Sequence, residues 1–225
     1  MPSPFKCIVG ECSVANGGGH YRSQNERRGS PHWALEPDVR SFVYQQPVIY
    51  YTFQGKPRRY TGDTLVQFWS PRRPLVVEYK LATAFEDDPA LRGYHNRLRG
   101  VLDERGLDFL VLTNSDTATP ALQNKEFFIR FQAEPESPFE REVFDAVIAA
   151  GTIRLEDLLC KLRPQAGAQM ALVPVVWRLV AWRRVFVDFN VTPSRESVIS
   201  RKPLTPPFYD RAAQVRFLRK EPSRN

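Results

Sequence analysis

The segment Leu75–Lys80, with the sequence LVVEYK, constrains the fold of this chain more than any other. Its first three residues are apolar, which is typical of a strand in the middle of a sheet. Because side chains alternate across a strand, Glu78 and Lys80 face one side and Tyr79 faces the other. Charged groups at the end of an apolar strand are costly to bury without a metal ion or a partner. The segment therefore predicts a central strand whose end carries functional polar groups.

The neighbouring sequence predicts the rest of a sheet. Apolar, β-branched and aromatic runs predict strands at 48–53, 59–69, 75–80 and 108–113. Between the last two, apolar residues at three- and four-residue steps predict a helix from about 88 to 105, with Gly106 at its C-terminus. Three strands, a helix and a further strand indicate an α/β fold with a mixed sheet. The 42% of hydrophobic residues excludes a wholly disordered chain.

The segments before and after this predicted sheet have different residue patterns. Residues 1–34, with several glycines, predict an irregular N-terminal arm, and 115–134 a connector. Helices are then expected at 139–150, from Thr152, and at 172–182, followed by strands at 184–191 and 196–201. Three short helices and a hairpin are the outline of a winged-helix domain, which we place at 134–200. Its third helix, with Arg178, Arg183 and Arg184 near its end, fits either a DNA groove or a protein partner.

The charge and the cysteine content indicate the partner and the cellular compartment to expect. The formal net charge is +7, and nucleic acid is the default partner of a basic protein. Residues 201–225 hold seven of the basic residues and two acidic ones, which predicts a basic tail that docks on DNA or on another protein. An odd number of cysteines, no secretory signal pattern and no run of about 18 apolar residues indicate a cytoplasmic protein without a membrane span.

A third polar group precedes the central strand. Asp63 follows Tyr60-Thr61-Gly62 near the start of the preceding predicted strand. If the two strands pair as a hairpin, Asp63, Glu78 and Lys80 converge at one edge of the sheet. Two carboxylates can hold Mg²⁺, which lowers the pKa of a water, and a lysine can stabilise the charge of a phosphate under attack. The alternative is a surface salt bridge between the lysine and either acid, which would contribute little.

Several segments, in order, resemble the TnsA-type transposon endonucleases of the PD-(D/E)xK restriction-endonuclease-like superfamily. Within residues 35–125 the segments similar to that family are LEPDVRSF at 35–42, Gln46-Pro47, YTGDTLV at 60–66, VEYK at 77–80 and GLDFLVLT at 106–113. The resemblance implies a restriction-endonuclease-like nuclease domain at 35–133, followed by the winged-helix domain. Gly62 stands where the family has proline, which is expected to loosen the turn.

The resemblance implies a metal-dependent hydrolase that nicks transposon ends during DNA recombination. Asp63 and Glu78 would bind Mg²⁺ or Mn²⁺, and Lys80 would be the catalytic lysine. The implied partners are DNA, a DDE-type transposase subunit and an AAA+ regulator ATPase. Two alternatives stay open. One is a catalytically impaired nuclease-fold subunit that acts in DNA binding or assembly, and the other is a related phage or restriction nuclease.

The sequence also departs from the family on its first helix. The family has a further metal-binding glutamate on its first helix, about eight residues before the glutamate that Glu36 resembles. Counting back eight residues reaches Arg28, and the surrounding stretch contains Gly29 and Pro31, which disfavour a helix. Glu26 or Glu36 can stand in for the missing acid, although neither has the expected spacing. Glu36 is therefore a tentative third metal ligand.

Overall fold

The computed structural model describes residues 10–14, 17–207 and 209, which form two compact units. Of the described residues, the first unit contains 10–14, 17–34, 38–118 and 209, and the second contains 35–37 and 119–207. The first unit is a mixed sheet with helices, so the predicted α/β class is confirmed. Within the described part of the chain, none of the helices has the length and apolar character needed to cross a membrane.

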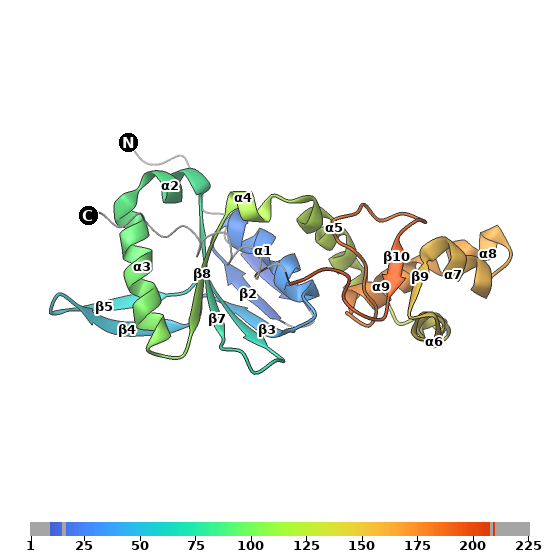
Figure 1. Cartoon of the computed structure of the whole chain (residues 1–225), viewed down its shortest axis with the longest axis horizontal. Helices are drawn as coiled ribbons and strands as arrows, with labels where there is room; N and C mark the ends of the chain where they lie inside the picture. Colours follow the sequence, from blue (N-terminus) through green and yellow to red (C-terminus); the bar gives the residue numbers. More distant parts are fainter. Residues whose placement is uncertain (1–9, 15–16, 208, 210–225) are drawn as a thin grey trace, which may run out of the picture. The chain divides into compact units, whose positions relative to one another are not determined.

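A six-stranded sheet organises the first unit (Figure 1). Its order is β1-β2-β3-β6-β7-β8, and a separate antiparallel hairpin is formed by β4 and β5. The pairs β2–β3 and β7–β8 are parallel, whereas the other neighbours are antiparallel. The strands are β1 (Gly10–Val14), β2 (Gly17–Tyr21), β3 (Val39–Tyr44), β4 (Val48–Phe53), β5 (Lys56–Thr61), β6 (Thr64–Phe68), β7 (Leu75–Lys80) and β8 (Asp108–Thr113).

Helices cover both faces of this sheet. They are α1 (Gln24–Leu35), α2 (Ala82–Asp87), α3 (Pro89–Asp103) and α4 (Asn114–Thr117). Val76 of β7 packs in one hydrophobic cluster with Leu98 and Leu102 of α3. Tyr79 faces the other side, where its hydroxyl accepts a hydrogen bond of 2.8 Å from the indole of Trp33 in α1. Strand β7 is therefore covered by α3 on the face of Glu78 and Lys80, and by α1 on the face of Tyr79.

Helix α1 runs through residues that were expected to break it. Gly29 is needed because a Cβ there would lie 2.0 Å from the hydroxyl oxygen of Tyr79, so the helix can approach the sheet only with glycine. Pro31 has no N–H to give to the carbonyl of Arg27, four residues earlier. The hydroxyl of Ser30 donates to that carbonyl at 2.9 Å instead. Tertiary contact and one side-chain hydrogen bond thus outweigh the poor intrinsic propensity.

Three expectations about the first half of the chain need correction. The described part of 1–34 is not an irregular arm, because it contains β1, β2 and α1. The connector 115–134 is largely helical, with α5 at Pro120–Ile129 and a 3-10 turn η1 at Arg130–Gln132. The strand expected at 59–69 is divided into β5 and β6 by Gly62 and Asp63.

Gly62 does not loosen the turn between β5 and β6. A Cβ at this position would lie 2.6 Å from the carbonyl oxygen of Gln46, so the backbone passes too close for a larger residue. The amide of Gly62 also donates to the carbonyl of Pro47 at 3.0 Å, a bond that proline cannot make. The break that places Asp63 at the start of β6 is therefore tightly held.

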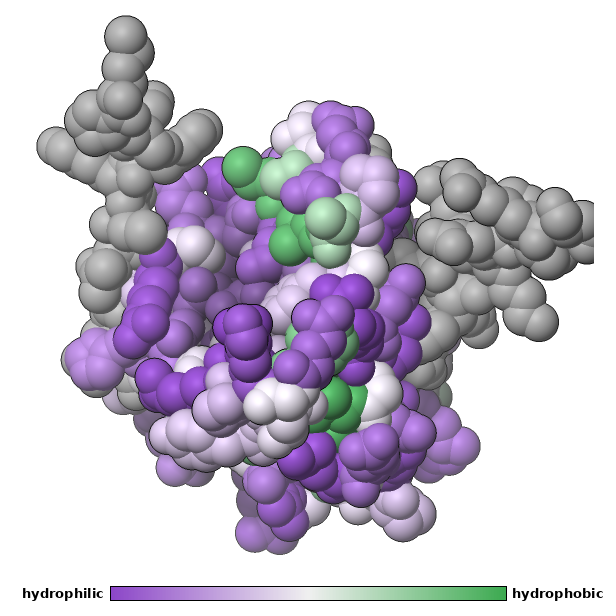
Figure 2. Space-filling model, turned by 90° about the vertical axis from the view of Figure 1, so that its left-hand side faces the viewer, coloured by the Kyte–Doolittle hydropathy of each residue, from purple (hydrophilic) through white to green (hydrophobic). Residues whose placement is uncertain are grey.

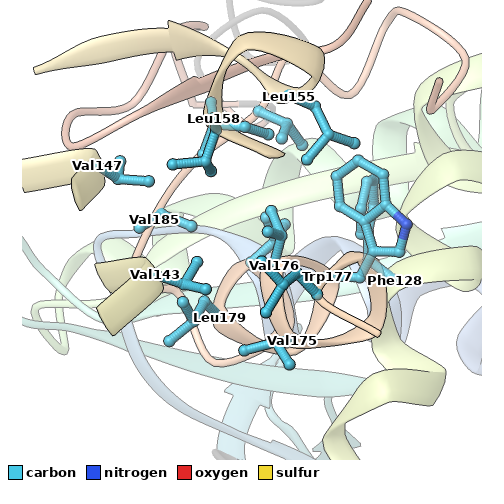
Figure 3. Packing of buried hydrophobic residues seen from close by; sticks show 14 of the residues in the cluster. Phe128, Val143, Val147, Leu155, Leu158, Val175, Val176, Trp177, Leu179 and Val185 are labelled. Atoms are coloured by element: carbon cyan, nitrogen blue, oxygen red, sulfur yellow. The ribbon is translucent and has the colours of Figure 1, made fainter. Parts of the chain in front are cut away.

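The second unit is mostly helical around one hydrophobic core (Figure 3). After α5 and η1 come α6 (Glu140–Ala150), β9 (Thr152–Arg154), α7 (Leu155–Leu162), α8 (Ala166–Met170), α9 (Val173–Ala181) and β10 (Val198–Ser200). Strands β9 and β10 pair antiparallel. The strand expected at 184–191 is reduced to an isolated bridge between Phe186 and Ser200. Thr152 begins a strand rather than a helix, because 152–154 pair with β10.

Helix α9 does not present arginines for a DNA groove. Its residues from Val175 to Ala181, except Arg178, are buried. Arg178 forms a close ion pair with the buried carboxylate of Glu140, and Arg184 lies 3.6 Å from the same carboxylate. Arg183 donates to the backbone carbonyl of Glu36 at 3.0 Å. The helix is a core element, and its arginines serve internal contacts.

The start of the predicted basic tail returns to the first unit. Tyr209 is buried there, with its ring stacked at 6.2 Å from that of Trp33 and the guanidinium of Arg72 lying 4.4 Å above it. The basic residues after Tyr209, and the short helix that 210–220 can form, lie outside the described residues.

Two glycine substitutions test the contact between α1 and the sheet. Gly29→Ala is expected to destabilise the protein by about 1–3 kcal/mol, because its Cβ overlaps the Tyr79 hydroxyl. Gly100→Ala in α3 is the matched control. No atom lies within 4 Å of a Cβ at position 100, so the higher helix propensity of alanine should stabilise by about 0.5–1 kcal/mol. Urea unfolding followed by circular dichroism measures both, and effects of the same sign would contradict this packing.

Candidate functional site

Asp63 lies beside Glu78 at the edge of the sheet where β6 begins. The register of the antiparallel strands β6 and β7 pairs Thr64 with Val77. Asp63, which precedes Thr64, therefore lies next to Glu78, which follows Val77. The backbone N–H of Tyr79 donates to Oδ2 of Asp63 at 2.8 Å and fixes the carboxylate there. Strands β6 and β7 thus form the hairpin that was assumed from the sequence, and this pairing brings Asp63, Glu78 and Lys80 together.

Glu78 is buried and held by two donors. The hydroxyl of Tyr60, at the end of β5, donates to Oε2 at 2.7 Å, and Nζ of Lys80 lies 2.5 Å from Oε1. The side chain of Lys80 is 29% exposed, whereas that of Glu78 is 9% exposed. The lysine therefore leads from the buried carboxylate to solvent. Burial and the adjacent carboxylate raise the pKa of Tyr60, so its proton stays available to Glu78.

Glu26 of α1 approaches Asp63 from the other face of the sheet. It is buried, and its Oε2 accepts hydrogen bonds from the amide of Arg22 at 3.0 Å and from the side-chain amide of Gln45 at 3.1 Å. Its charge acts on Asp63 and raises the pKa of that group. Asp63 thus lies between Glu26 on one side and the Glu78–Lys80 pair on the other. The first helix supplies an acid after all, at a spacing that the sequence comparison did not anticipate.

The carboxyl of Asp63 binds its proton more tightly than an ordinary aspartate does. Burial and the charges of Glu78 and Glu26 raise its pKa, while the Tyr79 amide and Lys80 act in the opposite direction. The balance is a pKa raised to about 7 from the ordinary value of 3.8. Excess negative charge in a partly desolvated site is the electrostatic condition that a bound cation relieves.

His95 of α3 belongs to this neighbourhood, although the sequence suggested a surface residue. It is buried, stacks on Phe109 with ring centroids 6.1 Å apart, and is close enough to Glu78 for that charge to affect it. Burial lowers its pKa, which favours the neutral ring. Because the Leu91 carbonyl 2.8 Å from Nδ1 can only accept, Nδ1 carries the proton. A single histidine on a predicted helix gave no sequence signal for this role.

Glu36, the tentative third ligand, has a different environment. It belongs to the second unit, where Nζ of Lys125 lies 2.5 Å from its Oε1. Both side chains are buried, and the same ammonium lies 5.2 Å from the centre of the Phe189 ring. The structure therefore gives Glu36 an internal ion pair and leaves Glu26 as the acid beside Asp63.

The fit of a divalent cation can be judged from the donors. Among residues 10–14, 17–207 and 209, no three His, Cys, Asp or Glu side chains come together closely enough to form a metal cluster. Mg²⁺ commonly uses only one or two carboxylates, with waters and substrate phosphates as its other ligands. Asp63 and Glu78 supply such a pair of hard oxygen donors. The site thus fits a Mg²⁺ or Mn²⁺ ion held by two carboxylates, and no all-protein cage is formed.

Comparison with known proteins adds no assignment. No family model matches the sequence, and no curated protein matches it either.

The pKa of Asp63 predicts a pH-dependent gain in stability for Asp63→Asn. In the native protein, ionising Asp63 costs free energy, and this cost grows between about pH 4 and pH 7, because the unfolded carboxyl loses its proton first. Asparagine removes the cost and can still accept from the Tyr79 amide. In EDTA, the variant should exceed the parent by on the order of 2 kcal/mol at pH 8 and by much less at pH 5.

Urea unfolding at both pH values measures this difference. Asp145→Asn is the control, because that aspartate is 65% exposed on α6 and lies 3.7 Å from Arg141 in a surface ion pair. It should show the same stability difference at pH 5 and pH 8. A difference for Asp63→Asn that does not change between the two pH values would contradict the buried-carboxylate assignment.

Proposed function

We propose that the protein is a metal-dependent DNA endonuclease that resembles the TnsA-type transposon endonucleases. The observation that carries this proposal is the meeting of Asp63, Glu78 and Lys80 at one edge of a mixed sheet, with Glu26 of α1 next to Asp63. This set contains the two carboxylates and the lysine that metal-assisted phosphodiester hydrolysis requires. DNA is the substrate that agrees with both the basic composition and the family resemblance.

The order of the elements supports the same proposal. Helix α1, the antiparallel strands β3, β6 and β7, helix α3 and the strand β8 parallel to β7 follow the arrangement expected for a restriction-endonuclease-like core. In the second unit, the order α6, β9, α7, α9 and β10 is compatible with a winged helix. Since α9 is buried, we favour a protein-binding or assembly role for this unit over groove recognition by that helix.

Each site residue has a role in the proposed hydrolysis. Asp63 and Glu78 would hold the cation, and the cation, when bound, polarises the phosphate and lowers the pKa of a water. The Tyr79 amide and the Tyr60 hydroxyl fix the two carboxylates, so little reorganisation is needed. The ammonium of Lys80 is the partly exposed group of the set and can stabilise the charge that develops on the phosphate. Glu26 adds negative charge beside Asp63, which favours a bound cation.

The partners of the proposed enzyme follow from the resemblance. They are a DDE-type transposase that performs strand transfer and an AAA+ ATPase that regulates it, in the cytoplasm. In this arrangement the present chain nicks the transposon ends. Co-purification of this chain with a DDE-type transposase from the same host tests the assembly, and failure to co-purify would count against these partners.

Nicking of supercoiled plasmid in Mn²⁺ tests the site, with the partner transposase added if the chain alone is inactive. Asp63→Asn should lower the nicking rate by at least about 100-fold, because it removes a charged metal ligand. Lys80→Ala should lower the rate by about 10²–10³-fold while Mn²⁺ binding is retained. Asp145→Asn, the same change on the surface of α6, should nick at the parent rate. Unchanged nicking by Asp63→Asn would remove the site assignment.

A second pair of variants decides which glutamate serves the site. Glu26→Gln should lower nicking while the protein stays folded, because glutamine can still accept from the Arg22 amide. Glu36→Gln should instead lower stability by about 3–5 kcal/mol, since it leaves the buried Lys125 ammonium without its carboxylate. The fraction of Glu36→Gln that remains folded should nick normally. Plasmid assays at a temperature where circular dichroism shows both variants folded compare them, and the reverse pattern would favour Glu36.

One observation favours a second candidate function. No three acidic, histidine or cysteine side chains cluster for a metal in the part of the chain that the structure describes. A nuclease fold that has lost activity and serves in DNA binding or assembly would show this. Titration calorimetry with Mn²⁺ separates the two functions. Binding that disappears in Asp63→Asn supports the enzyme, and absence of binding in the parent protein supports the impaired subunit.

A further inference from the structure

We propose that the β4–β5 hairpin and the adjoining helix α3 form a docking surface for duplex DNA, with the hairpin inserted in a groove. This inference rests on the proposed function for its substrate, and it assigns the surface that delivers DNA to Glu78. It follows from the charge, exposure and attachment of the hairpin.

Positive charge is concentrated on these two elements. Hairpin residues 48–61 contain three cationic side chains and no acidic one, and α3 with the residues that follow it to Arg105 adds four more. The cationic residues are Lys56, Arg58, Arg59, Arg92, Arg97, Arg99 and Arg105. The two acidic residues of the same stretch of α3 are Asp103 and Glu104, and Asp103 is neutralised by Arg73 at 2.7 Å. Seven cationic residues against two acidic ones on these elements are an excess that favours a polyanion.

The outer half of the hairpin is open to solvent. All six residues from Gln54 to Arg59 are exposed, and Tyr50 is 70% exposed. The register pairs Tyr50 with Arg59 on one face of the ribbon and Tyr51 with Arg58 on the other. Cationic side chains therefore occur on both faces. Figure 2 looks onto the end of the unit from which the hairpin projects, and hydrophilic residues cover most of that view.

The base of the hairpin is anchored next to the catalytic carboxylates. Ile49 and Tyr60 are buried against Leu98 and Leu102 of α3. The hydroxyl of Tyr60 donates to Glu78, so the last buried residue of the hairpin is a direct neighbour of the site. A DNA strand held on the exposed half would consequently be tied to the position of Glu78 through a single rigid ribbon.

Two contacts brace the ribbon against α3. The guanidinium of Arg97 lies 4.8 Å from the centre of the Phe53 ring, near the tip. Arg105 donates to the carbonyl of Tyr50 at 3.1 Å. These contacts hold the arm in a fixed direction and add two further cations to its side. A preformed surface loses little conformational entropy when it binds.

Duplex DNA is the occupant that best matches this shape and charge. A two-stranded β-ribbon has the width of the major groove, and cations on both faces of an inserted ribbon can reach the phosphates on both walls. An acidic protein segment would meet the same charge but would not need a projecting ribbon with cations on two faces. It is therefore the competing occupant in the experiment.

The test compares two triple variants of the full chain that remove equal charge. The first is Lys56→Gln, Arg58→Gln and Arg59→Gln in the hairpin. The control is Arg130→Gln, Arg141→Gln and Lys161→Gln, which are exposed residues of the second unit outside the predicted basic tail. Fluorescence anisotropy measures the Kd for a 30-base-pair duplex, for a single strand of the same length and for a polyglutamate peptide. All titrations contain EDTA, so binding is measured independently of nicking.

The hairpin variant should bind the duplex at least about tenfold more weakly than the control at 0.1 M salt. The slope of log Kd against log salt concentration should fall by about 2–3, as expected for three lost phosphate contacts. Equal affinities of the two variants would overturn the docking surface, and so would a loss confined to the single strand or to polyglutamate. A loss of duplex binding together with normal nicking by Asp63→Asn would retain this surface and remove the proposed active site. The reverse result would retain the site and remove the surface.

Discussion

The candidate site depends on the way Tyr79 joins three elements. Its amide holds the carboxylate of Asp63, and its hydroxyl accepts from Trp33 where Gly29 lets α1 come close. Because neighbours in a strand face opposite ways, the same residue that fixes α1 sends Glu78 to the other face. One buried tyrosine therefore sets the distance from the first helix to the strand that carries the acid and the lysine.

Local patterns were sufficient to predict much of the sheet. Strands β7 and β8 have the predicted bounds, and the helix expected at 88–105 is α3, which begins after Asp88 and ends at Asp103. Glu26 could not be ranked from the sequence, because a helix through Gly29 and Pro31 is formed only by a tertiary contact and by the hydroxyl of Ser30. The periodicity of a sequence does not show which side chains meet across strands. The hydrogen bond from Tyr60 to Glu78 was therefore not predicted.

A count of charges along the chain does not show which cations are available to a partner. The last residues hold most of the net surplus. In the second unit, Arg178 pairs with the buried carboxylate of Glu140, and Arg184, which lies 3.6 Å from the same carboxylate, stays 45% exposed. Net charge also hides local excess, since acids elsewhere offset the hairpin and α3 in the sum. Which cations remain available to a partner is decided by folding, and the exposed segment 54–59 became visible only in the structure.

The chain passes between its two units four times, at 34–35, at 37–38, at 118–119 and before Tyr209. Leu35–Pro37 belong to the second unit although they connect α1 to β3 of the first. The second unit is therefore not one continuous chain segment, and it cannot be transferred to another protein as a single insertion. Recombination would have to preserve a three-residue insertion between α1 and β3 as well as the segment that brings Tyr209 to Trp33. The two units are expected to be inherited together, and changes in one to be constrained by the other.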